Sequence, residues 1–256
     1  MKTAWDPEQY ERFRAERSQP FYDLLSLVRR RPRMRVVDLG CGTGELTQVL
    51  HRQLAAAETI GIDNSQAMLE QSRAFVEAAL RFERGDLREF AGDHHYDLIF
   101  SNAAMHWAPG HHELFERLTS GLAKEGQLAV QVPAMDDHPS HVVATEVARE
   151  EPFRVALGGY TRPNHVLAPE AYAVLLHRLG YREQHVRLQV YGHRLGSREE
   201  VIEWVKGALL TDYRGRMSAE LYQRFLDCYG ERLILQLDDS KPYLYPFKRI
   251  LIWGQR

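Results

Sequence analysis

The stretch from residue 36 to residue 45 constrains the fold of this chain more than any other, because an apolar strand leads directly into a glycine-rich turn. Residues 36–39 read Val-Val-Asp-Leu, and Gly40, Gly42 and Gly44 follow at alternate positions. Glycine lets the backbone turn sharply and approach a ligand more closely than a side chain would allow. The pattern therefore predicts a strand, a turn and a helix, with a nucleotide-type cofactor lying on the turn.

Polar residues also stand at the ends of the next three predicted strands. Asp63 follows the second strand and lies 19 residues after Gly44, where a carboxylate can accept hydrogen bonds from both ribose hydroxyls. Asp86 follows the third strand and Asn102 follows the fourth. Because ligands of open α/β sheets bind at the carboxyl edge of the strands, we expect these strand ends to line one crevice.

Hydrophobic periodicity predicts the other elements. Apolar residues recur at helical spacing in four segments of the first half, residues 21–28, 46–50, 68–79 and 114–122. Strands that alternate with such helices indicate a doubly wound parallel sheet. The alternation of strands and helices stops after a fifth predicted strand. Residues 134–169 are expected to be largely irregular, with one helix at 142–150. The remaining predicted elements are a helix at 172–179, a strand at 186–190, helices at 199–210 and 218–237, and a strand at 249–253.

Composition argues against several classes of partner. The 256 residues carry a formal net charge of −2, so we expect no nucleic-acid partner. The one basic run, residues 29–33, closes a helix and is expected to be a solvated cap. Because the chain has only two cysteines, we expect no disulfide framework. Since no apolar run approaches the length that spans a bilayer, we expect a cytoplasmic protein with no membrane partner.

The paired histidines are poor candidates for a metal site. His138 and His141 have a spacing that a metal could use, but no cysteine or acidic triad accompanies them. We therefore expect no metal. His111 and His112 are flanked by loop residues, and we expect both to be solvated.

The turn reads Asp-x-Gly-x-Gly-x-Gly from Asp38, and with Asp63, Asp86 and Asn102 behind it the chain resembles the class I S-adenosylmethionine-dependent methyltransferases. The resemblance implies a Rossmann-like sheet of seven strands, the last one antiparallel, with a mostly helical cap. It also implies S-adenosyl-L-methionine as cofactor and S-adenosyl-L-homocysteine as product. The resemblance also implies which residues bind each part of the cofactor. The methionine moiety would contact Asp38, Gly40, Gly42 and Asn102, and the ribose would bind to Asp63. Asn64 and Met68 would border the ribose and adenine, Asp86 and Leu87 would bind adenine, and Arg17 and Trp107 would make further cofactor contacts.

Within that family, several segments resemble the trans-aconitate 2-methyltransferases. Residues 102–109 read Asn-Ala-x-x-x-Trp-x-Pro, and residues 202–205 read Ile-x-Trp-Val. This likeness implies O-methylation of a small carboxylic acid, most like trans-aconitate, to a methyl ester. Residues 207–212 depart from it, because Thr211 and Asp212 stand where that family reads Arg-Pro. The departure favours the alternative of another small carboxylate or a hydroxylated natural product as acceptor. A cofactor-binding but catalytically silent partner protein is the remaining alternative.

A small anionic substrate requires fixed donors, and arginine offers a planar fork that matches a carboxylate. The resemblance places the substrate on Tyr10, Phe13, His106, His141, Tyr191, His193 and Arg249, with Arg162 and Arg194 as further candidate cations. His106 is the candidate catalytic residue. It would act as a base toward a hydroxyl acceptor, whereas a carboxylate is already ionised at neutral pH and needs none. Hydrogen bonding or packing is its alternative role.

The whole chain, residues 1–256, is expected to form a single methyltransferase domain. We expect residues 34–133 to be the cofactor-binding core. Residues 1–33 should supply N-terminal cap helices, and residues 134–168 and 197–246 should be cap insertions over the cofactor crevice. Composition and motifs leave the oligomeric state at a monomer or a weak homodimer.

Overall fold

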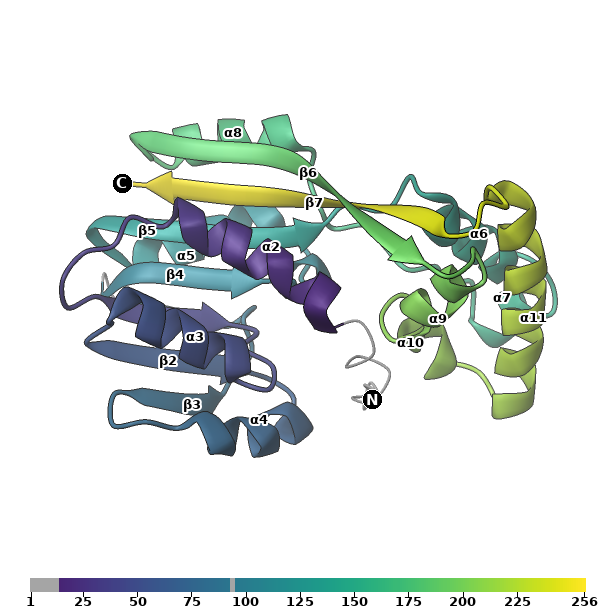
Figure 1. Cartoon of the computed structure of the whole chain (residues 1–256), viewed down its shortest axis with the longest axis horizontal. Helices are drawn as coiled ribbons and strands as arrows, with labels where there is room; N and C mark the ends of the chain where they lie inside the picture. Colours follow the sequence, from purple (N-terminus) through teal and green to yellow (C-terminus); the bar gives the residue numbers. More distant parts are fainter. Residues whose placement is uncertain (1–13, 93–94) are drawn as a thin grey trace. The chain divides into compact units, whose positions relative to one another are not determined.

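The computed structural model of the chain describes residues 14–92 and 95–256, and the side chains of residues 14–17 lie outside this description (Figure 1). The described residues fall into two compact units. The sheet unit holds Ser18–Pro133, His165–Gln189 and Arg249–Arg256. The helical unit holds Ala134–Asn164 and Val190–Lys248.

Seven strands form one sheet in the order β3-β2-β1-β4-β5-β7-β6. Their bounds are β1 Arg35–Leu39, β2 Glu58–Asp63, β3 Leu80–Arg84, β4 Tyr96–Asn102, β5 Leu122–Pro133, β6 Glu183–Leu195 and β7 Tyr243–Gln255. Strands β1 to β5 pair in parallel, and β7 pairs antiparallel with β5. This confirms the predicted Rossmann-like sheet. Because β2 and β4 lie on opposite sides of β1, the strand order reverses there, and such a switch point is where ligands bind.

Helices α2 (Arg14–Leu27) and α3 (Glu45–Leu54) cover the face of the sheet that is nearer the viewer in Figure 1. Phe21 and Leu24 of α2 are buried with Leu50 of α3 and Phe100 of β4, and the rings of Phe21 and Phe100 meet edge to face at 5.4 Å. Burial of each such side chain is worth about 1.5–3 kcal/mol. The other helices of the sheet unit are α4 Gln66–Ser72, η1 Arg73–Phe75, η2 Met105–Trp107, α5 His111–Gly121 and α8 Pro169–Arg178.

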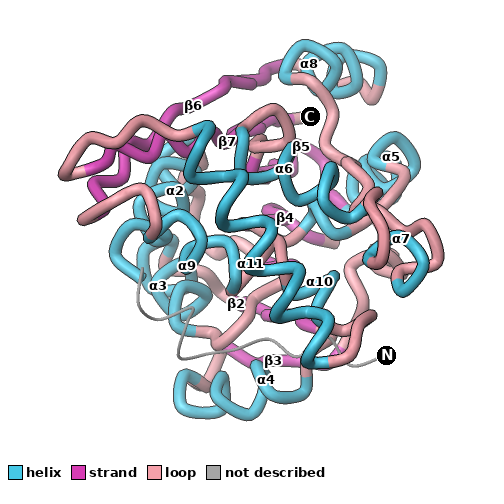
Figure 2. The backbone as a smooth tube through the Cα atoms, turned by 90° about the vertical axis from the view of Figure 1, so that its right-hand side faces the viewer, coloured by secondary structure: helices cyan, strands magenta, loops and turns pink. Residues whose placement is uncertain are grey.

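The helical unit has a hydrophobic core of its own. Its helices are α6 Pro139–Ala148, α7 Phe153–Ala156, α9 Glu200–Lys206, α10 Thr211–Arg214 and α11 Ala219–Gln236. Helix α11 lies beside α6 (Figure 2), with Phe225 and Tyr229 buried against Val143 and Val147. The Tyr229 hydroxyl donates to the Ser140 carbonyl at 3.0 Å. No helix among the described residues is both long and apolar enough to cross a membrane.

Several predicted elements differ in extent from the structure, since the strands at 186–190 and 249–253 are the longer β6 and β7, and the helix at 199–210 ends as α9 at Lys206. The helix expected at 68–79 is wrong in length, because α4 ends at Ser72 and Val76 is extended and exposed. The Ser72 hydroxyl donates to the Leu69 carbonyl, and the Gln48 side chain donates to the Phe75 carbonyl, so local side chains satisfy this turn. Residues 134–169 are less irregular than predicted, since they hold both α6 and α7.

Candidate active site

The glycine turn, residues 40–44, follows β1 with three left-handed glycines. Gly40, Gly42 and Gly44 have φ angles of 79°, 57° and 82°. A Cβ atom at Gly40 would lie 2.1 Å from the Cβ of Ala104, whereas one at Gly42 would meet no atom within 4 Å. Packing therefore requires glycine at position 40, and Gly42 leaves open space beside the backbone that a ligand can approach.

Asp38 is a buried carboxylate beneath this turn. It is 4% exposed, and it accepts a hydrogen bond from the Thr47 hydroxyl at 2.6 Å. Burial raises the pKa of Asp38 to about 7, partly opposed by the Thr47 hydrogen bond and reinforced by the negative charge of Asp63. A cation bound nearby would favour the ionised form of this group.

Asp63 ends β2 with its carboxylate held by two backbone amides. Gly42 donates to one oxygen at 2.9 Å, and Ser65 donates to the other at 2.8 Å. Each oxygen keeps a further lone pair for a ligand hydroxyl. Asn64 is exposed, and Met68 lies half-buried in the first turn of α4, where its amide donates to the Ser65 hydroxyl at 3.4 Å.

Asp86 follows β3 and is engaged by its neighbour. The Arg88 guanidinium forms an ion pair with it, and the Arg88 hydrogen bond lowers the pKa of Asp86. The adjacent Gly85 amide donates to the Asp63 carbonyl at 3.1 Å, which ties the ends of β2 and β3 together. Asp86 and Leu87 are both half-buried. A ligand donor at Asp86 would share its carboxylate with Arg88.

The end of β4 carries a buried acceptor and a strained residue. Asn102 closes the strand, and its Oδ1 atom is buried without a hydrogen-bond partner among the described residues. Ala103 has a φ of 54°, a left-handed value that costs an alanine about 1 kcal/mol or more. Helix η2 follows with His106 and Trp107, whose rings lie 4.8 Å apart. Unmet polar atoms and backbone strain together are typical of a functional site.

Strands β5 and β7 bring a buried arginine to the same sheet edge. Gln131 is the register partner of Asn102 on β5 and is fully buried. Arg249 on β7 lies opposite Pro133, is 5% exposed, and donates from Nη1 to the Gln131 side-chain oxygen at 3.3 Å. The Nε2 atom of Gln131 is buried with no partner among the described residues. Asn102, Gln131 and Arg249 thus form a polar group at the carboxyl edge of the sheet.

Known proteins place the chain in a family. A family model described as "Methyltransferase domain" matches residues 30–174. A trans-aconitate 2-methyltransferase from Deinococcus radiodurans is 42% identical over 258 residues, which cover 98% of each protein. The chain belongs to the trans-aconitate 2-methyltransferase family. A relative of the same name from Variovorax paradoxus is 36% identical and covers 96% of this chain and 94% of that protein.

The fold of this chain also occurs in solved structures of other methyltransferases. An S-adenosylmethionine-dependent methyltransferase from Mesorhizobium loti superimposes with a TM-score of 0.54 at 19% identity. The match covers 93% of this chain and 97% of that one. Family membership and fold agree that the chain is a methyltransferase enzyme.

Three predicted substrate residues of this trans-aconitate 2-methyltransferase family member belong to the helical unit. Tyr191 and His193 of β6 are 8% and 6% exposed, and the His193 ring stacks on Trp204 at 4.7 Å. His141 is 3.1 Å from the Ser140 hydroxyl, and burial lowers the pKa of His141 to about 3, helped by the positive charge of Arg162. Arg162 lies 3.8 Å from Asp212. Tyr10 and Phe13 lie outside the described residues, as does the side chain of Arg17.

Sequence reasoning missed two residues of the sheet unit. Gln131 was not singled out, although a glutamine inside an apolar strand was an available signal. His111 was expected to be solvated, and this is wrong, because it is 2% exposed and lies 3.1 Å from the Met105 carbonyl of η2. The long-range packing of α5 against α8 buries it, and no local pattern reports such packing.

Proposed function

We propose that this protein transfers a methyl group from S-adenosyl-L-methionine to a carboxylate of trans-aconitate and forms the methyl ester. The observation that carries the proposal is the 42% identity, over nearly the whole of both chains, to a curated trans-aconitate 2-methyltransferase. The geometry at the carboxyl edge of the sheet supports it. The acceptor would be a small anion.

The residues around the glycine turn fit this cofactor. The open space at Gly42 suits a ligand that presses on the backbone, and two carboxylates, Asp38 and Asp63, suit its cationic and hydroxyl donors. When bound, S-adenosyl-L-methionine supplies a sulfonium methyl to the attacking substrate oxygen, and the sulfur keeps the bonding pair in the S-adenosyl-L-homocysteine that remains.

Each cofactor residue then has a role. Asp63, already oriented by two amides, would accept the ribose hydroxyls, and Asp38 with the unpartnered Oδ1 of Asn102 would hold the amino-acid end. Asp86 and the Leu87 amide would bind adenine. The other proposed cofactor contacts are Gly40, Asn64, Met68, Trp107 and Arg17.

The acceptor carboxylate needs no base, because its reference pKa of about 4 leaves it ionised at neutral pH. The chain's task is then to orient it. We propose that His106 donates a hydrogen bond that orients the substrate, and that Arg249 pairs with one of its carboxylates. The Gln131 side-chain oxygen accepts a hydrogen bond from the Arg249 guanidinium and would keep it in place. Tyr191, His193, His141, Tyr10 and Phe13 stay candidates for further substrate contacts.

The deciding experiment is methyl transfer from labelled S-adenosyl-L-methionine to trans-aconitate, beside cis-aconitate, citrate and isocitrate. Base-labile label on trans-aconitate is the expected result. In the Arg249→Lys variant, KM for trans-aconitate should rise about tenfold or more, since lysine cannot reproduce a bidentate contact. The exposed Arg224→Lys variant is the matched control and should leave KM unchanged. Cofactor binding without label on any acid would reject the proposed reaction.

A second acceptor is favoured by one observation. Asp212 lies 3.8 Å from Arg162 and 3.4 Å from the Tyr160 hydroxyl, so this arginine of the helical unit is already matched by an acid. A substrate with fewer carboxylates would suit such a charge balance, and dicarboxylates therefore belong in the assay. The monomeric or weakly dimeric state and the cytoplasmic location stay predictions.

A further inference from the structure

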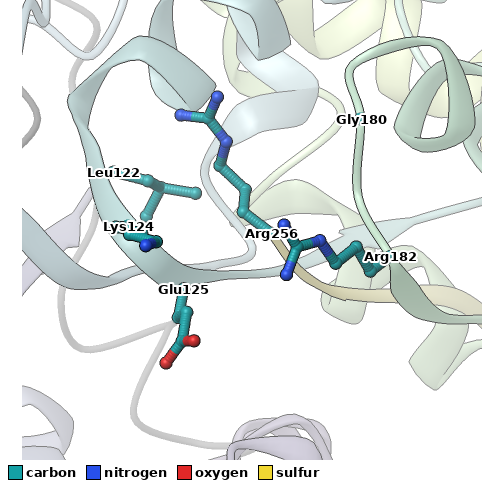
Figure 3. A pocket seen from close by; sticks show the side chains of 6 residues that line it. All are labelled: Leu122, Lys124, Glu125, Gly180, Arg182 and Arg256. Atoms are coloured by element: carbon teal, nitrogen blue, oxygen red, sulfur yellow. The ribbon is translucent and has the colours of Figure 1, made fainter.

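The sheet unit has a pocket at the edge opposite the glycine turn. Its volume is about 400 Å³, and its lining residues are Leu122, Lys124, Glu125, Gly180, Arg182 and Arg256 (Figure 3). They come from the start of β5, the turn between α8 and β6, and the residue after β7. Since β5 begins here and its carboxyl end lies at Pro133, this is the amino edge of the parallel strands. The strand ends that carry Asp63, Asn102 and Gln131 lie at the other edge.

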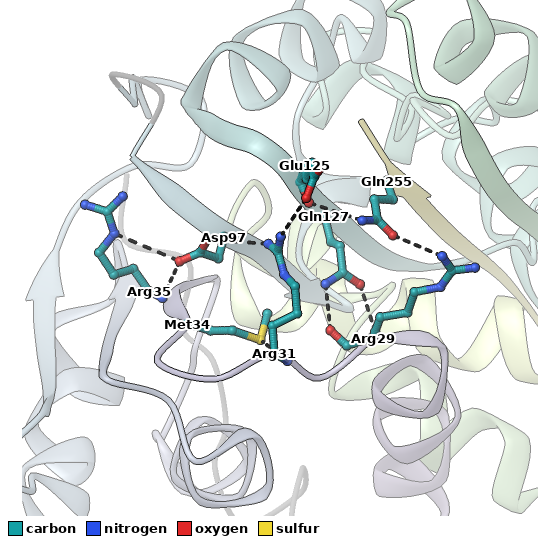
Figure 4. A network of polar contacts seen from close by, with 8 residues as sticks. All are labelled: Arg29, Arg31, Met34, Arg35, Asp97, Glu125, Gln127 and Gln255. Carbon is teal, nitrogen blue, oxygen red and sulfur yellow. Dashed lines mark hydrogen bonds and ion pairs between the residues drawn. The ribbon is translucent and has the colours of Figure 1, made fainter.

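Neighbouring arginines on this edge are matched by carboxylates. Arg29 pairs with Glu183. Arg31 lies 3.4 Å from Asp97 (Figure 4). Asp97 also accepts from the Arg35 amide at 2.8 Å. Arg29, Arg30 and Arg33 of the basic run are exposed, as expected of a solvated cap, while Arg29 and Arg31 also form ion pairs.

The three cations of the pocket lack such partners. Among the described side chains, no carboxylate lies within 4 Å of the charged nitrogens of Lys124, Arg182 or Arg256. Arg256 donates from Nη1 only to a neutral acceptor, the Thr119 carbonyl, at 3.2 Å. Glu125 does not compensate them, because its carboxylate points away from both arginines in Figure 3 and lies 3.9 Å from Arg31.

The backbone holds these side chains around open space. The Arg182 amide donates to the Gln255 carbonyl at 2.9 Å, and the Arg256 amide donates to the Gly126 carbonyl at 3.1 Å. Gly180 has a φ of 82°, and a Cβ there would meet no atom within 4 Å. Three segments far apart in sequence are thereby fixed beside one another, with no side chain at Gly180 to fill the pocket.

We infer that this pocket binds a small polyanion that carries at least two carboxylate or phosphate groups. Three cations line this one pocket without a carboxylate partner, and a polyanion bound there would gain charge-assisted hydrogen bonds from their donors. The volume lies within the range of small-molecule sites. Because the cations are solvent-accessible, binding should weaken as salt is added. The inference does not depend on the identity of the methyl acceptor.

Calorimetric titration with citrate and with pyrophosphate, in parallel with thermal unfolding, tests this site. At about 100 times Kd a bound probe should raise Tm by roughly 5–10 °C. Arg182→Glu reverses an exposed charge whose side chain makes no hydrogen bond among the described residues, so the fold should persist. It should weaken probe binding roughly ten- to hundredfold. The exposed Arg178→Glu variant on α8 is the matched control and should bind as the wild type does.

The variants also separate this pocket from the active site. Probe bound at the substrate site would survive Arg182→Glu, and methyl transfer by that variant should equal the wild-type rate. Binding of only one probe would support the site and identify its chemistry as carboxylate or phosphate. Absence of binding by both probes, or equal affinity in Arg182→Glu and wild type, would overturn the inference.

Discussion

The Nδ1 atom of His111 lies 2.5 Å from the hydroxyl of Tyr172, which joins α5 to α8 in the sheet unit. The other ring nitrogen of His111 donates to the Met105 carbonyl at 3.1 Å, so Nδ1 is the acceptor of the tyrosine proton. The Tyr172 oxygen in turn accepts from the Leu167 amide at 3.2 Å. This chain of hydrogen bonds reaches η2, the helix that carries His106 and Trp107, and it specifies one neutral tautomer of His111.

Tyr172→Phe should therefore destabilise the protein by about 1–3 kcal/mol, because it leaves the buried Nδ1 atom of His111 without a donor and removes the acceptor of the half-buried Leu167 amide. For a chain of this length that corresponds to a fall in Tm of very roughly 2–10 °C. The control is Tyr22→Phe, since Tyr22 is 44% exposed and its change removes only a solvated hydroxyl. Equal Tm values for the two variants would mean that the hydrogen bonds between His111, Tyr172 and Leu167 contribute nothing to stability.

Acid should destabilise the protein through His141. Burial, with Arg162 and His138 adding positive charge, lowers the pKa of His141 to about 3. A depressed pKa means that the folded state favours the neutral ring, so the stabilisation is present above pH 6.5 and is lost as pH falls toward 3. Between pH 7 and pH 5 the loss from this group is about 2 kcal/mol.

His141→Asn tests this, because asparagine keeps an acceptor near the Ser140 hydroxyl but cannot titrate. Urea unfolding at pH 7 and pH 5 should show a smaller difference in the variant than in the wild type. The exposed His185→Asn variant should keep the wild-type difference. An unchanged pH dependence in His141→Asn would show that other groups cause the loss of stability between pH 7 and pH 5.

The strand-end residues could be predicted from the sequence because their signals are local. An apolar run that stops at Asp38, Asp63 or Asn102 reports both the strand and its polar end within a few residues. The contacts that define the site's surroundings are different in kind. His111 and Tyr172 are 61 residues apart, and Gln131 and Arg249 are 118 residues apart. Only the folded sheet brings such pairs together, so their burial and partners could not be read from spacing.

Ala55→Gly should stabilise the protein by about 1 kcal/mol, or roughly 2–4 °C in Tm. Ala55 caps the C-terminus of α3 with φ 47° and ψ 46°, a left-handed conformation that strains any residue with a Cβ. Its side chain is exposed, so little packing is lost. Ala57→Gly is the control, because Ala57 is also exposed but has no positive φ, and it should lose about 0.5 kcal/mol. The same sign of change at both positions would contradict this account.

Cofactor affinity should depend on pH through Asp38. Burial raises the pKa of Asp38 to about 7 in the free protein, and the proposed ammonium group beside it would favour the ionised form. Binding then releases a proton, so S-adenosyl-L-homocysteine should bind more weakly as pH falls below 7, by up to tenfold per unit, and level off above 7. Calorimetry in two buffers of different ionisation enthalpy measures the released proton. Asp38→Asn should abolish both the release and the pH dependence, and a flat wild-type profile would place the ammonium elsewhere.

Gly42→Ala should separate cofactor binding from folding. The new methyl group meets no atom within 4 Å, so the cost to stability should be only the strain of a left-handed alanine, about 1 kcal/mol. Affinity for S-adenosyl-L-homocysteine should nevertheless fall about tenfold or more, since the methyl group occupies the space that the proposed cofactor needs. Gly158→Ala is a closely matched control, because Gly158 has a φ of 60° and equally open surroundings but lies in the helical unit. It should show the same fall in Tm with wild-type affinity.

Gly40→Ala should instead lower Tm far more, because its Cβ would lie 2.1 Å from that of Ala104. Equal affinities in the Gly42 and Gly158 variants would remove the cofactor from this turn.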